Sequence, residues 1–428
     1  MKSSAQYGVQ DLIVITTGKI GNALFAFIVS VLIARNLGAS GFGLFTLSLS
    51  VLIITLELVG SEAVDNGLVR FASLYMDKNT NKVHLIFKIA LEFKLLSASI
   101  LLLLGFLFVK LVLASIIGRP ELKDAIMYGL AGGCFASFWR YILAILQSYE
   151  RFVTYAVINV IPNLLKVLFV LFLILANSLN LTYALTINVI VVILGFFAGF
   201  SFIPKHFIKA KGDKKDVAFQ LFHFSKWIII SNLFFAIYSR LDIFILSYFK
   251  DAEILGIYSV ALSLITALDL FYVSMLTKLF PQASALTHRE EFSAHIKRSL
   301  GISSALALLL TPLFFVAEPL ILLFFSEKFF DSILIFKFLL FGFLFTLLFN
   351  PLLLILYARN KPYLVTIVYF ILLPLSFVGN LIFIPMYGAM GAACIVLATR
   401  VTGGLLVLFL VYREIFTPDD VSLKQNSP

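Results

Sequence analysis

Long apolar runs constrain this chain more than any other feature of its sequence. A helix that spans a membrane needs about 20 mainly apolar residues, and about twelve stretches meet that requirement. They run approximately over residues 12–33, 42–60, 86–109, 124–147, 155–176, 181–203, 224–248, 255–281, 299–318, 331–357, 363–383 and 389–411. The runs are continuous rather than alternating apolar and polar, which is typical of helices and not of barrel strands. The sequence therefore predicts an all-α polytopic membrane protein.

The composition supports this fold class and excludes several functions. Hydrophobic residues make up 61% of the chain and charged residues 13%, whereas soluble domains carry about 45–50% and about 25%. A soluble enzyme, a disordered chain and a nucleic-acid-binding domain are thereby excluded. Both cysteines lie inside apolar runs, the histidines lack metal-ligand spacing, and no phosphate-binding loop motif is present. We therefore predict no cofactor, no metal and no enzymatic activity.

Lysine and arginine are unevenly distributed among the loops. With the N-terminus in the cytoplasm, roughly 18 basic residues fall on the cytoplasmic side and about 6 on the other. Six of the cytoplasmic lysines lie between residues 205 and 226. The first apolar run follows a short polar segment and has no cleavage site, so it is interpreted as a retained first helix. The bias predicts that both termini are cytoplasmic.

The chain also contains an apparent internal repeat. The segment that begins at Gly43 (GLFTLSLS) is similar to the segment that begins at Gly256 (GIYSVALS), an offset of 213 residues. Pro162 and Pro374 are 212 residues apart, and each is expected to interrupt its helix. These offsets predict two six-helix lobes, residues 1–213 and 214–428, related by a pseudo-two-fold axis. The alternative is a chance similarity between helices of similar composition.

Ionisable residues at membrane depth are the candidate functional residues, because burying them in hydrocarbon is costly. The basic candidates are Lys19, Arg140, Lys166, Arg240 and Arg400. If these side chains converge, they form a cationic cavity between the lobes. The alternative for each is an interfacial side chain that extends toward the head groups. That alternative is the default for Lys88, Glu92 and Lys94, which lie near one end of their run.

Acidic residues at similar depth are fewer. Glu57, Asp242 and Asp269 are the candidates for coupling transport to an ion, with capping or a salt bridge as the alternative role. Arg240 and Asp242 are two residues apart. On a continuous helix over 224–248 they point in opposite directions and cannot pair.

Several motifs resemble a known family. They are ARNLG at residues 34–38 with FGLF at 42–45, Trp139-Arg140 with Gln147 and Arg151, SRLD at 239–242, and YGAMGAA at 387–393. In this order the motifs are similar to those of Wzx-type flippases in the multidrug/oligosaccharidyl-lipid/polysaccharide superfamily. The resemblance implies a fold like that of multidrug exporters of the same superfamily, with two lobes that alternate access.

The resemblance also implies a substrate and a location. The substrate class is an undecaprenyl-pyrophosphate-linked repeat unit, such as that of O-antigen in lipopolysaccharide, moved to the periplasmic leaflet of the bacterial inner membrane. A polysaccharide polymerase and a chain-length regulator are the implied protein partners.

The residues leave alternatives open. A cation-coupled multidrug exporter of the same superfamily is one, although the run 12–33 carries Lys19 and, within its apolar part, no acid. A transporter of another lipid-linked glycan precursor is a second. A non-transporting scaffold of a polysaccharide assembly complex is a third, but a scaffold has no need for so many buried charges.

Overall fold

The computed structural model describes residues 8–111, 119–284, 289–358 and 361–416. Helices make up nearly all of these residues, and no β-strand occurs among them. The first group of helices is α1 (Gly8–Leu58), α2 (Ser61–Tyr75), α3 (Thr80–Phe108), α4 (Lys123–Ser148), α5 (Phe152–Leu175) and α6 (Leu181–Phe200). The remaining helices are α7 (Lys214–Tyr238), α8 (Leu241–Phe249), α9 (Ala252–Ser284), α10 (Arg289–Leu310), α11 (Ala317–Phe325), α12 (Ser332–Phe349), α13 (Leu353–Ala358) and α14 (Pro362–Phe416). The all-α prediction is confirmed.

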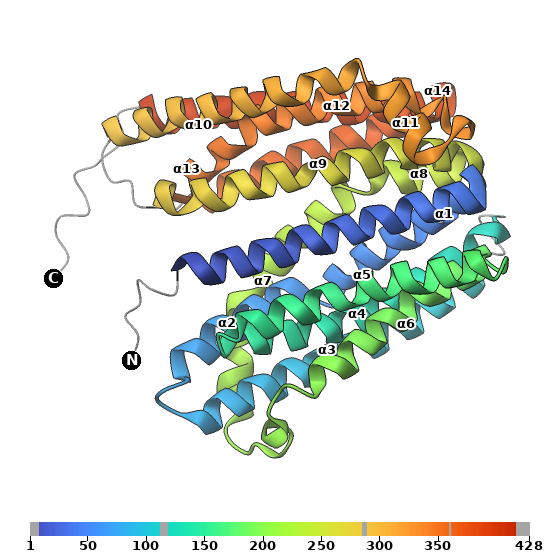
Figure 1. Cartoon of the computed structure of the whole chain (residues 1–428). Coiled ribbons are helices and arrows are strands. Elements are labelled where there is room, and N and C mark those ends of the chain that lie inside the picture. The colour runs from blue at the N-terminus through green and yellow to red at the C-terminus, as the bar shows by residue number, and fades with distance from the viewer. Residues whose placement is uncertain (1–7, 112–118, 285–288, 359–360, 417–428) are drawn as a thin grey trace.

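Within the described part of the chain, ten helical segments are long and apolar enough to cross a membrane. The first and last of them are helical hairpins, because α1 bends at Gly38 (φ 71°) and α14 bends at Gly388 (φ 58°). Glycine has no Cβ to clash in this left-handed region, so one residue can reverse the chain. In Figure 1, α1 (blue) runs to the right-hand end and returns. With the two legs of each hairpin counted separately, the ten segments provide the twelve predicted crossings.

The two ends of the bundle differ in charge. The α2–α3 turn, the segment 201–213 and the described ends of the chain at Gly8 and Phe416 lie at one end, on the left in Figure 1. We call this the basic end, because the segment 201–213 carries Lys205, Lys209 and Lys211. The bend of α1 lies at the opposite end in Figure 1, and the bend of α14 at Gly388 lies beside Lys250 and Ile254 at the α8–α9 junction. Lys2, Arg359 and Lys424, which also contributed to the predicted charge bias, lie outside the described residues.

The largest hydrophobic cluster among the described residues joins helices of both halves at the opposite end. There, Ile33 and Phe42 of α1 belong to the same cluster of buried residues as Leu255 of α9 and Phe325 of α11. At the basic end the core is split into separate clusters. One is formed by α2–α5 with the start of α7, and another by α13 and α14 with Phe292 of α10.

The contact between α1 and α9 is two-fold symmetric. A Cβ added at Gly43 would overlap the carbonyl oxygen of Ala252, and one added at Gly256 would overlap that of Ala39. Ala39 and Ala252, like Gly43 and Gly256, are 213 residues apart. The two similar segments of the sequence therefore pack against each other, each through its glycine. Small residues let helix backbones approach this closely in a membrane.

Polar contacts reinforce the same end. Arg119, which precedes α4, donates to the carbonyl oxygens of Tyr248 (3.2 Å) and Lys250 (2.7 Å) at the end of α8. Arg35 of α1 donates to the carbonyl oxygen of Leu323 in α11. These arginines are among the few basic residues on this side of the molecule, and both join the first half to the second.

We expect Gly256→Ala to destabilise the protein, because its Cβ has no space in the α1–α9 contact. Overpacking of this kind costs about 1–3 kcal/mol, measurable as a lower melting temperature in detergent. Gly301→Ala on α10 is the matched control, since nothing lies within 4 Å of a Cβ there. Equal melting temperatures for the two variants would contradict the close contact.

Candidate functional site

A first group of charges lies within the first half. Arg140 of α4 contacts Glu57 near the end of α1 (Nη1–Oε1, 3.6 Å) and Glu62 of α2 (Nη2–Oε2, 3.9 Å). Asn232 of α7 donates to the other oxygen of Glu57 at 3.4 Å. Arg140 is half-buried and Glu57 is buried. Two of the predicted site residues, Arg140 and Glu57, thus form an ion pair.

Beside this ion pair lies a second one that sequence reasoning missed. Lys94 of α3 has a side-chain exposure of 0%, and its Nζ lies 3.0 Å from Asp65 Oδ1 of α2. The same Nζ donates to the carbonyl oxygen of Ser137 at 3.3 Å. The expectation that Lys94 is solvated was wrong. Its position near one end of an apolar run suggested exposure, but α2 and α4 cover this face of α3.

Together these residues, Glu57, Glu62, Asp65, Lys94 and Arg140, form what we call the Arg140 cluster. Three carboxylates and two basic groups give it a formal charge of −1 when all are ionised. A pocket of about 160 Å³ adjoins the cluster, with Glu62, Asp65, Arg140, Gln147 and Tyr155 in its wall. Within the first half, the described residues therefore form a mixed-charge pocket rather than a purely cationic one.

A second group of charges lies in the second half. Asp242 of α8 and Asp269 of α9 are both in electrostatic range of Arg240 and of Arg400 on α14. We call these four residues the Arg240 cluster. Asp242 is buried. Its carboxylate accepts hydrogen bonds from the Tyr258 hydroxyl and from the backbone N–H of Ile243 (2.9 Å). Four of the predicted residues are thus brought together here.

Both arginines of the Arg240 cluster keep an unsatisfied donor. Arg240 Nε and Arg400 Nη1 are buried and have no hydrogen-bond acceptor among the described residues. An unpaired buried N–H of a charged group is costly, so such groups normally have a partner. These two nitrogens are the unsatisfied donors of the Arg240 cluster.

Arg240 owes its position to a break in the helix. The sequence predicted one helix over 224–248, but α7 ends at Tyr238 and α8 begins at Leu241, with Arg240 at φ −128° and ψ 1°. The prediction that Arg240 and Asp242 point in opposite directions assumed a continuous helix, and that assumption was wrong. The break leaves backbone groups unpaired within the helix, a feature tolerated in membranes where protein or water covers them.

The remaining candidates lie apart from both clusters. Lys19 is exposed on the first leg of α1, and Lys166 is half-buried on α5. Among the described residues, neither forms an ion pair. Pro162 and Pro374 lie inside α5 and α14, and both helices continue through them. Helix breaks occur instead at positions such as Gly38, Gly60, Gly388 and Arg240. A proline removes only one hydrogen bond, and a bend can absorb its ring.

The chain was compared with known proteins. The family model for polysaccharide biosynthesis proteins matches residues 9–287, more than half of the chain. The chain belongs to this family. No curated protein matches it.

Solved structures of transporters share the fold. The lipid II flippase MurJ in its inward closed conformation has a TM-score of 0.72 and 17% identity, over 93% of this chain and 87% of that one. An inward-facing multidrug resistance MATE transporter of the MOP superfamily has a TM-score of 0.74 and 12% identity, over 92% and 94%. An outward-facing MATE transporter of that superfamily has a TM-score of 0.66 and 12% identity, over 94% of each chain. The chain is a multi-pass membrane protein with the fold of these transporters.

We expect Lys94→Met to lower the free energy of unfolding by about 3–5 kcal/mol, because it leaves the Asp65 carboxylate buried without its counter-ion. The double variant Lys94→Met/Asp65→Leu should recover most of this loss. Thermal unfolding of the purified variants in detergent measures both effects.

The control for this prediction is Lys214→Met. Lys214 pairs with Glu92 at 2.8 Å, but both side chains are about half exposed, so the loss should be small. If Lys94→Met were no more damaging than Lys214→Met, the buried ion pair would have no structural importance.

Proposed function

We propose that this protein moves an undecaprenyl-pyrophosphate-linked oligosaccharide repeat unit from the cytoplasmic to the periplasmic leaflet of the bacterial inner membrane. Family membership supports a role in polysaccharide biosynthesis, and the fold supports transport. The observation that carries the proposal is the pair of buried, unsatisfied arginine donors in the Arg240 cluster.

Arginine suits the anionic part of such a substrate. A pyrophosphate loses its hydration when it enters a membrane, and the planar guanidinium replaces it with paired, charge-assisted hydrogen bonds. Arg240 and Arg400 have donors free for this purpose, and Arg140 can exchange Glu57 or Glu62 for the ligand. Lys19 and Lys166 are proposed as further basic contacts along the path, since neither is held by a carboxylate among the described residues.

The carboxylates beside these arginines suggest how transport is coupled to an ion. When a phosphate binds an arginine, the displaced carboxylate loses its counter-ion and binds a proton more readily. Linkage makes the effect reciprocal, so protonation of Glu57, Asp242 or Asp269 strengthens phosphate binding. Each coupling candidate thus acts through the arginine next to it.

Helix α7 can connect the two clusters. Its Asn232 contacts Glu57, and Arg240 follows eight residues later, roughly 12 Å further along the helix direction. In our proposal residues 1–213 and 214–428 form two lobes, and α7 transmits movement between them. The continuous core at the end opposite the basic loops corresponds to a state closed on the periplasmic side. Both termini are then cytoplasmic, as the lysine and arginine bias predicts.

A second candidate function is multidrug efflux coupled to a cation. The formal charge of −1 in the Arg140 cluster favours it, because an acidic pocket attracts cationic compounds. The two proposals differ in the charge of the ligand. Stabilisation of the purified protein by polyprenyl pyrophosphate, but not by lipophilic cations, supports the first, and the converse result supports efflux.

We expect Arg240→Ala and Arg400→Ala to abolish flipping of a fluorescent lipid-linked oligosaccharide in proteoliposomes while leaving the protein inserted. The corresponding lysine variants should keep partial activity, because lysine retains the charge but loses the two-pronged geometry. Arg298→Ala on the exposed side of α10 is the control and should behave like the wild type. Wild-type rates in both cluster variants would remove these arginines from the path.

We also expect the rate of flipping to depend on membrane potential. Moving an anion away from the negative side is favourable by about 2.3 kcal/mol per charge per 100 mV. In proteoliposomes, a negative potential on the departure side should accelerate flipping, and the reversed potential should slow it. Rates unaffected by either the potential or a pH gradient would contradict ion or potential coupling.

A further inference from the structure

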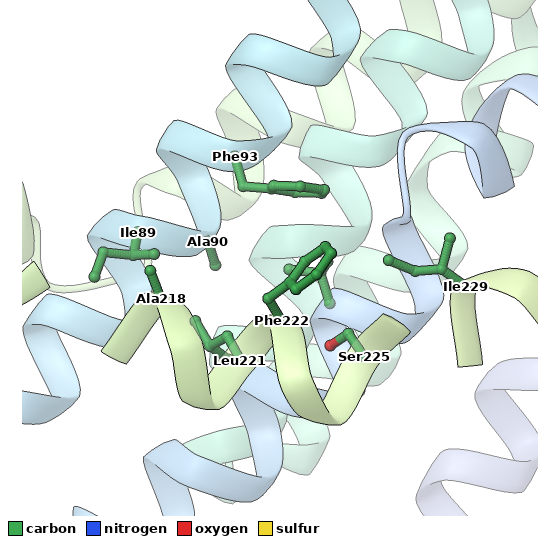
Figure 2. Close-up of a pocket in the computed structure, with 9 residues that line it drawn as sticks. Ile89, Ala90, Phe93, Ala218, Leu221, Phe222, Ser225 and Ile229 are labelled. Carbon is green, nitrogen blue, oxygen red and sulfur yellow. The ribbon is translucent and has the colours of Figure 1, made fainter. Parts of the chain in front are cut away.

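An apolar groove lies between α2, α3 and α7, apart from both charge clusters. It has a volume of about 270 Å³, and Figure 2 shows Phe93 of α3 extending toward Phe222 of α7 across it. Val64 of α2 and Ile229 of α7 also line it. The one polar residue in the lining, Ser225, donates its hydroxyl to the carbonyl oxygen of Ala63 at 3.0 Å, so it offers no free donor. The groove is therefore suited to a hydrocarbon ligand.

The groove is accessible from the membrane. Ala218 and Phe222, which line it, are exposed, and Phe222 has a relative exposure of 58%. Its α7 residues, 218 to 229, lie roughly 6 to 22 Å along the helix from Lys214. The hydrocarbon core of a bilayer is about 30 Å thick. The groove thus lies toward the basic end of α7.

The groove and the charged pocket are on either side of α2. Val64 lines the groove, while its neighbour Asp65 lines the charged pocket. On α3, Phe93 lines the groove and the next residue, Lys94, forms the ion pair with Asp65. A hydrocarbon site and a charged site are therefore adjacent, one helix apart, which suits a ligand with a long apolar chain and a charged head.

The depth of the charged pocket distinguishes between possible ligands. Asp65 is ten residues, about 15 Å, from the end of α2 at Tyr75. A bulk phospholipid keeps its head group at the membrane surface, whereas this pocket lies within the bundle, with walls from α2, α4 and α5. A carrier lipid whose head is drawn into the protein does reach it.

From this juxtaposition we infer that the groove binds the polyprenyl chain of the lipid carrier while the phosphate of its head group replaces a carboxylate at Arg140 in the adjacent pocket. The inference rests on the proposed function and adds where the chain of the substrate lies. The chain then stays in contact with both protein and membrane instead of crossing with the glycan.

The test uses a polyprenyl phosphate with a photoreactive diazirine on its chain and no sugar. The purified full-length protein is reconstituted in nanodiscs of phosphatidylglycerol and phosphatidylethanolamine, irradiated, and the labelled peptides are identified by mass spectrometry. We expect labelling within residues 61–75, 80–95 and 214–230. Excess unlabelled polyprenyl phosphate should compete, and the same amount of phosphatidylglycerol should not.

Ala218→Trp is the diagnostic variant, because it fills the groove from its exposed side. We expect labelling there to fall about tenfold, corresponding to about 1.4 kcal/mol. Ala305→Trp is the matched control: Ala305 is exposed on α10, on the same face as Leu308 and Leu309, and should leave labelling unchanged. The melting temperatures of both variants show whether each remains folded.

The outcomes are distinct. Labelling elsewhere, labelling that Ala218→Trp does not reduce, or equal competition by phosphatidylglycerol overturns the inference, the last by making the groove a general lipid site. Because the probe carries no glycan, groove labelling does not require transport. If labelling behaves as expected but lipid-linked oligosaccharide is not flipped in proteoliposomes, the proposed transport function fails and the polyprenyl site stands.

Discussion

The close approach of α1 and α9 determines how the two halves of the molecule are arranged. Lipid tails are as apolar as leucine, so helices in a membrane gain little from hydrophobic association and depend on close packing. Gly43 and Gly256 provide that packing at one end, with Ala39 and Ala252 in the equivalent positions opposite them. The common core and the two arginine contacts lie at the same end. At the basic end the buried clusters are separate, and the start of α7 packs there against α2 and α3 of the first half.

The cost of burying charge explains why the ionisable residues form groups. An isolated arginine at membrane depth is expensive, and one beside a carboxylate is less so. Each cluster therefore combines both signs, and in the proposed function the ligand has to compete with carboxylates for the arginines. This requirement makes binding weaker than in a purely basic cavity, but it also makes release possible. In a carrier, a site that binds too tightly holds its cargo and does not complete a cycle.

The sequence predicted the crossings well, because hydropathy is a local property. Hydropathy identifies an apolar span from its own residues, whatever that span packs against. The offset of 213 residues between Gly43 and Gly256 can likewise be found in the sequence before their contact is known. The ion pair between Asp65 and Lys94 joins two helices, and nothing within either segment indicates that α4 covers Lys94. The helix break at Arg240 carries no proline or glycine signal. The convergence of Arg240, Asp242, Asp269 and Arg400 likewise depends on the packing of α8, α9 and α14, which hydropathy does not specify.

An amphiphile presents a carrier with two solvation problems that differ in kind. The charged head must exchange water for protein donors, whereas the apolar chain can stay in an environment like the one it leaves. In our proposal helix α2 separates these tasks, since one face lines a carbon-walled groove and the other carries Glu62 and Asp65. Residues on neighbouring positions of a helix point in different directions, so Val64 and Asp65 can serve both tasks from adjacent positions. In this proposal the polyprenyl chain stays on the groove side of α2 throughout. A small movement of α2 is then enough to change how far a bound head group is exposed to water.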